Sequence, residues 1–257
     1  MNQKIVKNSL FKDNKMIIKY IKYLVEWLKE KVKNANCNGL IFGISGGIDS
    51  AVVAALCKKA FPNNSLGVIM PIDNMEHDIN DINQLVNNLK LNTKNIDLKN
   101  SFVALTNELK DIDDRLAISN IKPRLRMTTL YALGQQKKYL VVGTDNAAEY
   151  FIGYFTKYGD GGVDLLPISH LLKCEVKEMA KYLNIPESII NKKPSAGLWE
   201  GQNDEDELGI TYYEIDNYIM GNYDLITPEN KEKMIKLHKF SQHKRDKAYQ
   251  PKKINEI

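Results

Sequence analysis

Hydrophobic positions near the start of the chain recur with the period of an α-helix. Between Asn14 and Asn34 they fall on one stripe, with lysines on the opposite side, which is the pattern of an amphipathic helix. Short apolar runs then alternate with further helical patterns. The predicted strands cover residues 39–44, 66–70, 95–98 and 139–143, and the further predicted helices cover 50–61, 78–90, 120–136 and 145–152. This alternation predicts an α/β fold, a doubly wound parallel sheet flanked by helices.

Two stretches interrupt this alternation. Residues 153–167 are rich in glycine, and residues 192–209 contain glycines, a proline and the acidic run 204–207. Loops of this length inside a compact domain are often functional or mobile, so we predict that 192–209 form a mobile active-site loop. Residues 228–249 are predicted to form a basic helix. We expect one domain over residues 1–257, with residues 1–13 as an N-terminal extension.

The bulk composition argues against several classes of protein. The chain has 257 residues, of which 43% are hydrophobic and 26% charged, and its net charge of +4 comes from interleaved signs. Such a surface gives little support for nucleic-acid binding. The longest apolar runs fall short of the roughly 18 residues that a membrane helix needs, and the basic N-terminus lacks the apolar segment of a signal peptide. Cys37, Cys57 and Cys174 are far apart, which favours a reducing cytoplasm.

The sequence Gly43-Ile-Ser-Gly-Gly-Ile-Asp-Ser50 lies between a predicted strand and a predicted helix. Its glycines let the backbone approach an anion, and the helix that follows directs free N–H groups toward a phosphate. A P-loop would carry a lysine where Asp49 stands. Asp49 suits a phosphate site if Mg²⁺ lies between them, because Mg²⁺ binds carboxylates together with phosphate oxygens. The alternative is an ordinary glycine-rich turn, with Asp49 as an acidic residue of the first helical turn.

Five separated motifs then identify a family resemblance. Residues 45–50, SGGIDS, resemble the signature of the ATP pyrophosphatases, whose fold is that of the adenine nucleotide alpha hydrolases. Residues 141–176, VVGTDNAAEYFIGYFTKYGDGGVDLLPISHLLKCEV, resemble ammonia-dependent NAD synthetases. Further matches are NIKPRLRM at 120–127, KPSAGLWEGQNDEDELG at 193–209 and HKR at 243–245, in the order typical of that family. The resemblance covers residues 14–250.

The resemblance implies a ligase that forms a C–N bond in the last step of NAD biosynthesis. The nicotinate carboxylate of deamido-NAD attacks the α-phosphorus of ATP, and pyrophosphate leaves. Ammonia then attacks the adenylated carboxyl group, which gives NAD and AMP. The substrates expected from the resemblance are therefore ATP, deamido-NAD and ammonia, with Mg²⁺ as cofactor.

The resemblance also assigns an ATP and metal site. The positions that match ATP contacts are Gly43, Ile44, Ser45, Gly46, Gly47, Ile48, Asp49, Ser50, Thr144, Lys173 and Ser195. Asp49 and Glu149 match the Mg²⁺ ligands, and Lys173 is expected to neutralise charge on the departing pyrophosphate. Without the motif, Glu149 would be an ordinary helix-surface glutamate, and Thr144 would be the N-cap of the helix that follows.

A second set of residues matches contacts to deamido-NAD: Arg124, Lys157, Asp164, His243 and Lys244. Cationic side chains of this kind suit the phosphates of a dinucleotide. Asp160 matches an aspartate proposed as the base that converts ammonium into ammonia, and it is also a natural turn residue before two glycines. Asn146 stands where many family members have histidine, so we expect no proton transfer at this position.

The source of ammonia follows from what the chain lacks. Glutamine-dependent relatives carry an added amidase domain with a catalytic cysteine, and residues 1–13 are too short to form one. Cys57 is predicted to lie in the core, and Cys174 would need a positioned base to act as a nucleophile. We therefore predict no glutaminase domain and the use of free ammonia. Because the family forms homodimers, the resemblance also implies a homodimer.

Two other functions compete with this interpretation. Another adenylating enzyme, such as one that modifies tRNA, would need an RNA-binding extension or cysteine sites, and neither is visible in the sequence. A nucleotide sensor would hold ATP without turnover. The presence of both candidate metal ligands, Asp49 and Glu149, argues against a sensor.

Overall fold

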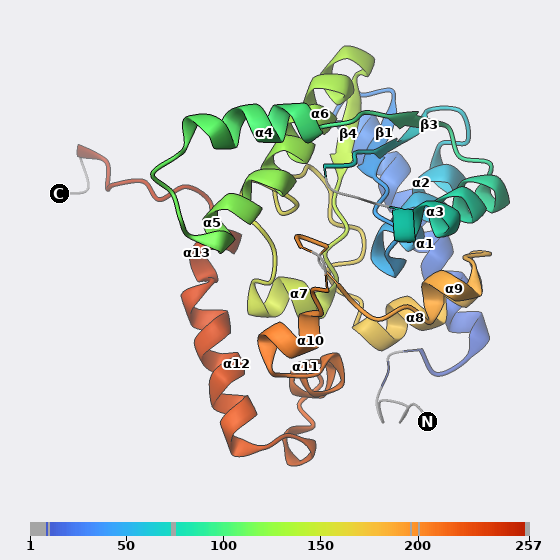
Figure 1. Cartoon of the computed structure of the whole chain (residues 1–257). Coiled ribbons are helices and arrows are strands. Elements are labelled where there is room, and N and C mark those ends of the chain that lie inside the picture. The colour runs from blue at the N-terminus through green and yellow to red at the C-terminus, as the bar shows by residue number, and fades with distance from the viewer. Residues whose placement is uncertain (1–8, 10, 73–75, 196, 200, 255–257) are drawn as a thin grey trace.

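The computed structural model describes residues 9, 11–72, 76–195, 197–199 and 201–254. In this part of the chain a four-stranded sheet forms the centre of the molecule (Figure 1). Its strands are β1 (Gly39–Gly43), β2 (Ser65–Ile69), β3 (Thr93–Asn95) and β4 (Tyr139–Val142). Their order is β3-β2-β1-β4, and every neighbouring pair is parallel. The predicted α/β fold with a parallel sheet is confirmed.

Helices account for most of the remaining structure. In chain order they are α1 (Asn14–Asn34), α2 (Ile48–Ala60), α3 (Glu76–Leu89), α4 (Lys99–Glu108), α5 (Arg115–Ser119), α6 (Ile121–Lys137), α7 (Ala147–Ile152), α8 (Lys173–Lys181), α9 (Glu187–Ile190), α10 (Asp204–Leu208), α11 (Tyr212–Ile219), the 3₁₀ turn η1 (Tyr223–Leu225), α12 (Pro228–Phe240) and α13 (Gln242–Arg245). Within the described ranges, no helix is both long and apolar enough to cross a membrane.

Both faces of the sheet are buried, as the apolar strands require. In β1, Leu40 and Phe42 pack into a core cluster with α1, α2, α3, α8 and α9, and Ile41 between them packs on the other face with residues of α4 and α6. All three side chains are fully buried. Alternating side chains of a strand point to opposite faces, so helices on both sides explain why the strand is apolar throughout.

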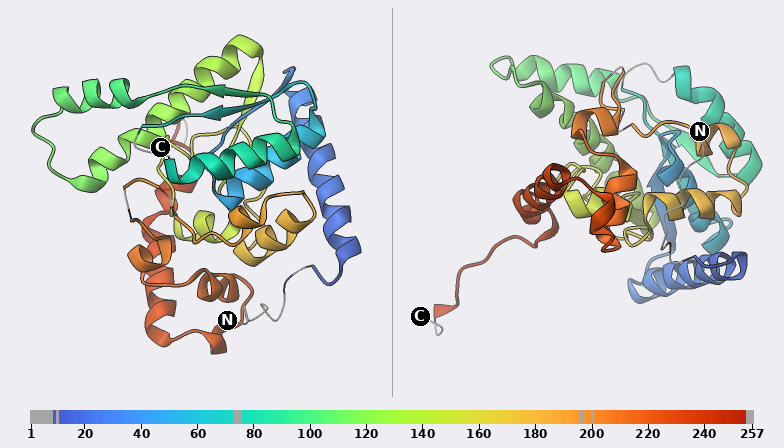
Figure 2. Two further views of the ribbon diagram at one scale, coloured as in Figure 1. Left: turned by 45° about the vertical axis from the view of Figure 1, so that its right-hand side comes forward. Right: turned by 90° about the horizontal axis from the view of Figure 1, so that it is seen from below.

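A smaller core lies beside the sheet and carries the C-terminal helices. Ile152 of α7 packs there with Leu208 of α10, Ile215 of α11 and Met234 of α12. Figures 1 and 2 show these helices grouped together, with α12 along one side of the molecule. This packing places the start of α11 and the acidic helix α10 beside α7.

The topology places a switch point at the carboxyl ends of β1 and β4. From β1 the chain proceeds to β2 and β3 on one side, whereas β4 is added on the other side of β1. The loops after β1 and β4 therefore leave two neighbouring strands in opposite directions. Such a place is a switch point, where open α/β sheets bind ligands. The 43–50 loop and the motif that begins at Gly143 meet there.

Several sequence predictions are confirmed and several are wrong. The first helix has the predicted bounds, and the side chain of Asp13 caps it by accepting from the backbone N–H of Met16 at 2.8 Å. The third strand is Thr93–Asn95, earlier than the predicted 95–98. All of its residues are exposed, so no apolar run marks it. Helices α4 and α5 were not predicted, and α4 has no buried residue to give a periodic signal.

The predicted helix over 228–249 is also wrong at its C-terminal end. Helix α12 ends at Phe240, and the hydroxyl of Ser241 bonds back to the carbonyl oxygens of Leu237 and His238 at 2.6 and 3.2 Å. The acidic run in the 192–209 segment is not irregular either, since it forms α10 behind the N-cap Asn203. Residues 196 and 200 of that segment, and 1–8 and 10 of the N-terminal extension, lie outside the described residues.

Candidate active site

The loop after β1 is shaped by its two serines. The hydroxyls of Ser45 and Ser50 lie 3.0 Å apart, and Ser50 also donates to the carbonyl oxygen of Gly47 at 2.9 Å. Gly46 has φ +79°, and a β-carbon there would approach the Asp78 side chain to 3.1 Å. A glycine is therefore required where the loop passes α3. The loop ends at the N-terminus of α2, whose free N–H groups suit a phosphate.

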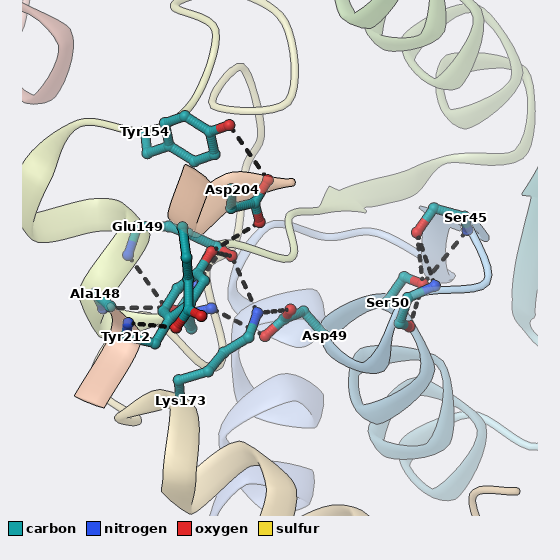
Figure 3. A network of polar contacts seen from close by, with 12 residues as sticks. Ser45, Asp49, Ser50, Ala148, Glu149, Tyr154, Lys173, Asp204 and Tyr212 are labelled. Carbon is teal, nitrogen blue, oxygen red and sulfur yellow. Dashed lines mark hydrogen bonds and ion pairs between the residues drawn. The ribbon is translucent and has the colours of Figure 1, made fainter. Parts of the chain in front are cut away.

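Three predicted site residues from distant parts of the sequence meet beside this loop (Figure 3). The Nζ atom of Lys173, at the start of α8, lies 2.5 Å from Oδ2 of Asp49 and 3.2 Å from Oε1 of Glu149. The lysine side chain is 5% exposed and the two carboxylates about 15%. Asp49 comes from α2 and Glu149 from α7, so the meeting depends on the neighbouring positions of β1 and β4.

Asn146 holds this group from the side of α7. Its backbone N–H and side-chain carbonyl complete a capping box with Glu149, and its amide nitrogen donates to Oδ1 of Asp49 at 3.0 Å. The side chain is fully buried. The N-cap of α7 is therefore Asn146, and the alternative of Thr144 as the cap is wrong because Thr144 stands two residues too early.

Tyr212 links the same carboxylates to the C-terminal helices. Its hydroxyl lies 3.0 Å from Oε1 of Glu149 and 3.0 Å from Oδ2 of Asp204, and the Nζ atom of Lys173 lies 4.6 Å from the centre of its ring. On the other side, Tyr154 contacts both Asp204 and Glu207. The acidic helix α10 is thus connected to the Asp49–Lys173–Glu149 group through Tyr212 (Figure 3).

The charges of this group are unbalanced. Burial raises the pKa of Glu149 to about 7, although Lys173 opposes the shift. For Lys173, burial alone would lower the pKa, but Asp49 and Glu149 outweigh burial and raise it above its usual range. One ammonium facing two carboxylates leaves one negative charge in excess, so Lys173 stays charged and the group attracts a further proton or cation.

These carboxylates fit a magnesium site. They converge on a single cationic nitrogen, which shows that a positive charge can be held between them. No third acidic, histidine or cysteine side chain completes a metal cluster within the described residues. Mg²⁺ commonly uses one or two carboxylates and takes its other ligands from phosphates and water, so two protein ligands beside a phosphate loop are sufficient.

The residues predicted to contact deamido-NAD gather around the 153–167 loop. Arg124 donates to the carbonyl oxygen of Lys157 at 3.3 Å, and the Nζ atom of Lys157 donates to the carbonyl oxygen of His243 at 2.5 Å. Lys244 donates to the carbonyl oxygens of Gly153 and Phe155, each at 2.8 Å. A cavity of about 380 Å³ lies beside them, and Met127, Tyr131, Lys157, Tyr158, Gly161, Gly162, Val163, Lys244 and Asp246 line it.

Two further predicted residues have structural partners of their own. Asp164 accepts from the hydroxyl of Tyr131 at 3.0 Å and from the backbone N–H of Val141 at 2.8 Å. Asp160 accepts from the backbone N–H of Thr156 at 2.9 Å, which closes the predicted turn. Asp160 is solvent-exposed, but the surrounding protein desolvates it enough to raise its pKa.

Ser195 is not brought into this group. It is exposed, and its hydroxyl accepts from the backbone N–H of Gly197 at 3.1 Å. The 192–209 segment is attached elsewhere: Lys192 at its start pairs with Asp78 and Asp81 of α3. Further along the segment, the carbonyl oxygen of Leu198 accepts from the Nζ atom of Lys122 in α6 at 2.5 Å. The predicted role of Ser195 therefore needs a movement of this loop.

No pattern in the sequence indicates Asp216, which positions Lys173. Asp216 of α11 is 1% exposed, and its two oxygens accept from the backbone N–H groups of Lys173 and Cys174, each at 3.1 Å. Burial and the charge of Asp216 raise the pKa of the Cys174 thiol. A protonated thiol is a poor nucleophile, which agrees with the prediction that Cys174 is not catalytic. Cys57 lies in the core, as predicted.

The pH dependence of the unfolding free energy should reveal the raised pKa of Asp216. Burial raises its pKa from 3.8 to about 6, so between these values the folded protein retains a proton that the unfolded chain loses. The stabilisation present at low pH is therefore lost as pH rises to about 6. Relative to Asp216→Asn, wild-type protein should lose about 3 kcal/mol of unfolding free energy over this interval. Urea titrations of both proteins from about pH 4 to pH 7 measure this difference, and parallel curves would contradict it.

Comparison with known proteins identifies the family to which this chain belongs. The model of the NAD synthase family matches residues 20–255. The NH(3)-dependent NAD(+) synthetase of Mycoplasmopsis pulmonis is 53% identical over 246 residues, which are 95% of each chain. A solved NMN synthetase from Francisella tularensis has 39% identity and a TM-score of 0.87, over 91% of this chain and 98% of the other.

A second solved structure extends the comparison. The NH3-dependent NAD synthetase from Campylobacter jejuni, in complex with nitrate, has 28% identity and a TM-score of 0.77, over 92% of this chain and 99% of the other. The fold, the family match and these relatives agree with the resemblance found in the motifs. The chain belongs to the NAD synthase family.

Proposed function

We propose that this protein catalyses the ATP-dependent amidation of deamido-NAD with ammonia, giving NAD, AMP and pyrophosphate. The observation that carries the proposal is the convergence of Asp49, Lys173 and Glu149 at the switch point of the sheet. This convergence occurs in a chain that matches an NH(3)-dependent NAD(+) synthetase over 95% of both lengths.

In the first half of the reaction the chain binds ATP and separates its phosphates. The 43–50 loop and the N-terminus of α2 hold the phosphates. Asp49 and Glu149 would hold Mg²⁺, which supplies Lewis-acid stabilisation of charge on the phosphate oxygens. Lys173 stands at the same place and neutralises charge that develops on the leaving pyrophosphate. Pyrophosphate departs as the nicotinate carboxylate bonds to the α-phosphorus.

In the second half the chain positions the dinucleotide and delivers ammonia. The cavity beside the 153–167 loop is lined by Lys157 and Lys244, which suit phosphates. Arg124 and His243 lie next to this cavity through their contacts with Lys157. Asp164 is available at the same loop to accept from ribose or amide groups. Asp160 acts as the base that takes a proton from ammonium.

The proposal also includes the oligomeric state and the cellular compartment of the enzyme. The active form is a homodimer in the cytoplasm, as the family resemblance implies. Three cysteines that form no disulfide support a reducing compartment. ATP, deamido-NAD and ammonia are its partners, and residues 1–257 act as one domain.

A second substrate has support from one comparison. The solved NMN synthetase is more similar to this chain than the Campylobacter jejuni NAD synthetase is, in both identity and TM-score. The alternative substrate is therefore nicotinate mononucleotide, which carries the same carboxylate and lacks the adenylate half. The 53% identity to an NAD(+) synthetase favours the dinucleotide.

A single assay separates these possibilities. Purified protein, ATP and Mg²⁺ are combined with deamido-NAD or nicotinate mononucleotide, and with ammonium or glutamine, and the amide product is measured. We expect turnover with deamido-NAD and ammonium, and none above background with glutamine. Preference for the mononucleotide would select the second substrate, whereas robust glutamine-driven turnover would refute ammonia dependence.

The 192–209 segment is proposed to close over the bound substrates and exclude water from the adenylate. Trypsin cleavage after Lys192 should slow several-fold when ATP and deamido-NAD are both present, because closure removes the exposed segment from the protease. ATP alone serves as the control. An unchanged cleavage rate with both substrates would contradict closure.

A further inference from the structure

The joint between α12 and α13 lies directly against the end of α7. Ser241 forms this joint, since it is both the C-cap of α12 and the N-cap of α13. Gly153 is the C-cap of α7 with φ +72°, and a β-carbon at this glycine would lie 2.1 Å from the β-carbon of Ser241. Only a glycine lets the two segments approach this closely. The 153–167 loop begins at the same glycine, so the joint borders the start of that loop.

Arg245 connects the joint to both helices. Its Nη1 atom donates to the carbonyl oxygens of Tyr150 and Phe151 in the last turn of α7, at 3.0 and 3.2 Å. Its Nη2 atom donates to the carbonyl oxygen of His238 in the last turn of α12 at 2.5 Å. The last carbonyls of a helix lack N–H partners within the helix, and a cation near them is favourable. One guanidinium group therefore joins the C-terminal ends of α7 and α12.

Helix α7 depends on contacts of this kind because it is short. Its six residues are far fewer than the roughly 12 that an isolated helix needs. The N-terminal end is held by Asn146, which caps the helix and donates to Asp49 at 3.0 Å. The C-terminal end is held by Arg245. The first contact fixes the side of the candidate metal ligands, and the second fixes the point at which the 153–167 loop leaves α7.

The two lysines that line the cavity are bonded across the same joint. Lys157 of the loop donates to the carbonyl oxygen of His243 in α13 at 2.5 Å. In the opposite direction, Lys244 of α13 donates to the carbonyl oxygens of Gly153 and Phe155, each at 2.8 Å. A displacement of α13 from the end of α7 would therefore move both cations of the cavity.

We propose that Arg245 is a positioning residue for deamido-NAD, an inference that rests on the proposed function. Arg245 does not line the cavity, so it acts through its neighbours. By joining the ends of α7 and α12, it sets the places of Lys157 and Lys244, and through them the place of the dinucleotide phosphates. The family resemblance assigns roles to His243 and Lys244 in the HKR motif and none to Arg245.

Arg245→Met tests this role, because ATP and deamido-NAD are proposed to bind at different parts of the site. The KM for deamido-NAD should rise about tenfold, and kcat/KM for deamido-NAD should fall about 100-fold, as expected for a slightly misplaced substrate. The KM for ATP and the half-saturating Mg²⁺ concentration should stay within about twofold of wild type, because the 43–50 loop shares no partner with Arg245. Lys239→Met removes an exposed cation from the last turn of α12 and is the matched control.

Chemical rescue provides a second readout. Arg245→Ala leaves space for a free guanidinium ion, which has the same planar set of donors as the arginine side chain. Millimolar guanidinium chloride should lower the raised KM for deamido-NAD of this variant several-fold, whereas sodium chloride at equal ionic strength should not. Arg245→Met should show no such rescue, because the methionine side chain fills the space.

A substitution on the other side of the joint tests the same idea without changing Arg245. In Gly153→Ala the new β-carbon would push Ser241 and the joint away from α7. This variant should also raise the KM for deamido-NAD and leave the KM for ATP unchanged. Gly221→Ala is the matched control, because Gly221 has φ +78° and open space around it. It shares the backbone strain but displaces nothing, so its KM values should equal those of wild type.

Failure of this role is distinguishable from failure of the proposed function. A wild-type protein that forms no NAD from deamido-NAD would refute the proposed function. With an active wild type, the positioning role is overturned if the KM for deamido-NAD in Arg245→Met is unchanged or rises in step with the KM for ATP. A loss confined to kcat that follows a smaller folded fraction would also overturn it. If Arg245→Met does not fold, the KM values of Gly153→Ala and Gly221→Ala decide in the same way.

Discussion

Replacing Lys173 by methionine is expected to lower the free energy of unfolding of the ligand-free protein by about 3 to 5 kcal/mol. The ammonium group is buried between Asp49 and Glu149, at 2.5 and 3.2 Å. Methionine fills most of the same volume but leaves the two carboxylates facing each other without a cation. The loss comes from that uncompensated charge and not from a cavity. Chemical denaturation at about pH 8, above the raised pKa of Glu149, measures it.

The helix that begins with Lys173 also provides the control. Lys181, at the other end of α8, pairs with Glu178 at 2.7 Å, but both side chains are about half exposed. Lys181→Met should cost less than about 1 kcal/mol, as surface pairs do. The double variant Lys173→Met, Glu149→Gln should recover part of the stability because it removes one of the two facing charges. Equal costs at Lys173 and Lys181 would contradict the charge argument.

The pH dependence of this variant has a defined sign. The raised pKa of Lys173 means that its stabilising contribution is complete below the usual lysine pKa and is lost only in strongly alkaline solution. On the acid side the difference between wild type and variant should shrink as Glu149 takes a proton near pH 7. A difference that stays constant down to about pH 4 would mean that lost packing, and not charge, causes the effect.

Local patterns were sufficient for the features that local physics controls. The stripe of apolar residues and the cap at Asp13 define α1 to the residue. Apolar strands between helices indicate a parallel sheet, and the glycines of the 43–50 loop indicate an anion site at its edge. The helix and sheet predictions succeed because each depends on side chains that are close in sequence, and the anion site stays a prediction. The bounds of β3 failed for the same reason, since its exposed residues carry no such pattern.

The partners of the site residues could not be predicted in this way. Tyr212 and Asp216 reach α7 and α8 only because α11 packs in the C-terminal core. No spacing in the sequence records that contact. Asn146 is an instructive case, because the absence of a titratable side chain suggested a lost function. Its amide instead caps α7 and holds Asp49, roles that depend on hydrogen bonding and not on a proton.

The ligand-free site is stable because it contains its own cation. Lys173 and Asn146 satisfy the oxygens of Asp49 before any substrate arrives. Mg²⁺ bound with ATP would take over part of the charge between Asp49 and Glu149, which would release Lys173 toward the phosphates. In the proposed reaction the same residue would thus stabilise the site before substrate binds and would act on the leaving group. Substitution of Lys173 should therefore affect stability and activity in other proportions than substitution of Asp49 or Glu149.

Asp49→Asn should separate these two effects. Loss of the charge is expected to reduce NAD formation by more than about 100-fold, since even the outer-shell partners of metal ligands are worth about 10 to 100-fold. The half-saturating Mg²⁺ concentration should rise as well. Unfolding free energy should fall by only about 1 to 2 kcal/mol, because asparagine keeps one acceptor oxygen and Lys173 keeps Glu149.

The comparison variants make this expectation specific. Glu149→Gln removes the second candidate ligand and should shift the Mg²⁺ dependence in the same direction. Asp113→Asn removes an exposed carboxylate and should change neither property. The structure orders the outcomes: Lys173→Met costs the most stability, whereas Asp49→Asn costs activity far out of proportion to stability. If Asp49→Asn unfolded as readily as Lys173→Met, or kept its Mg²⁺ dependence, the aspartate would be a structural partner of the lysine and not a metal ligand.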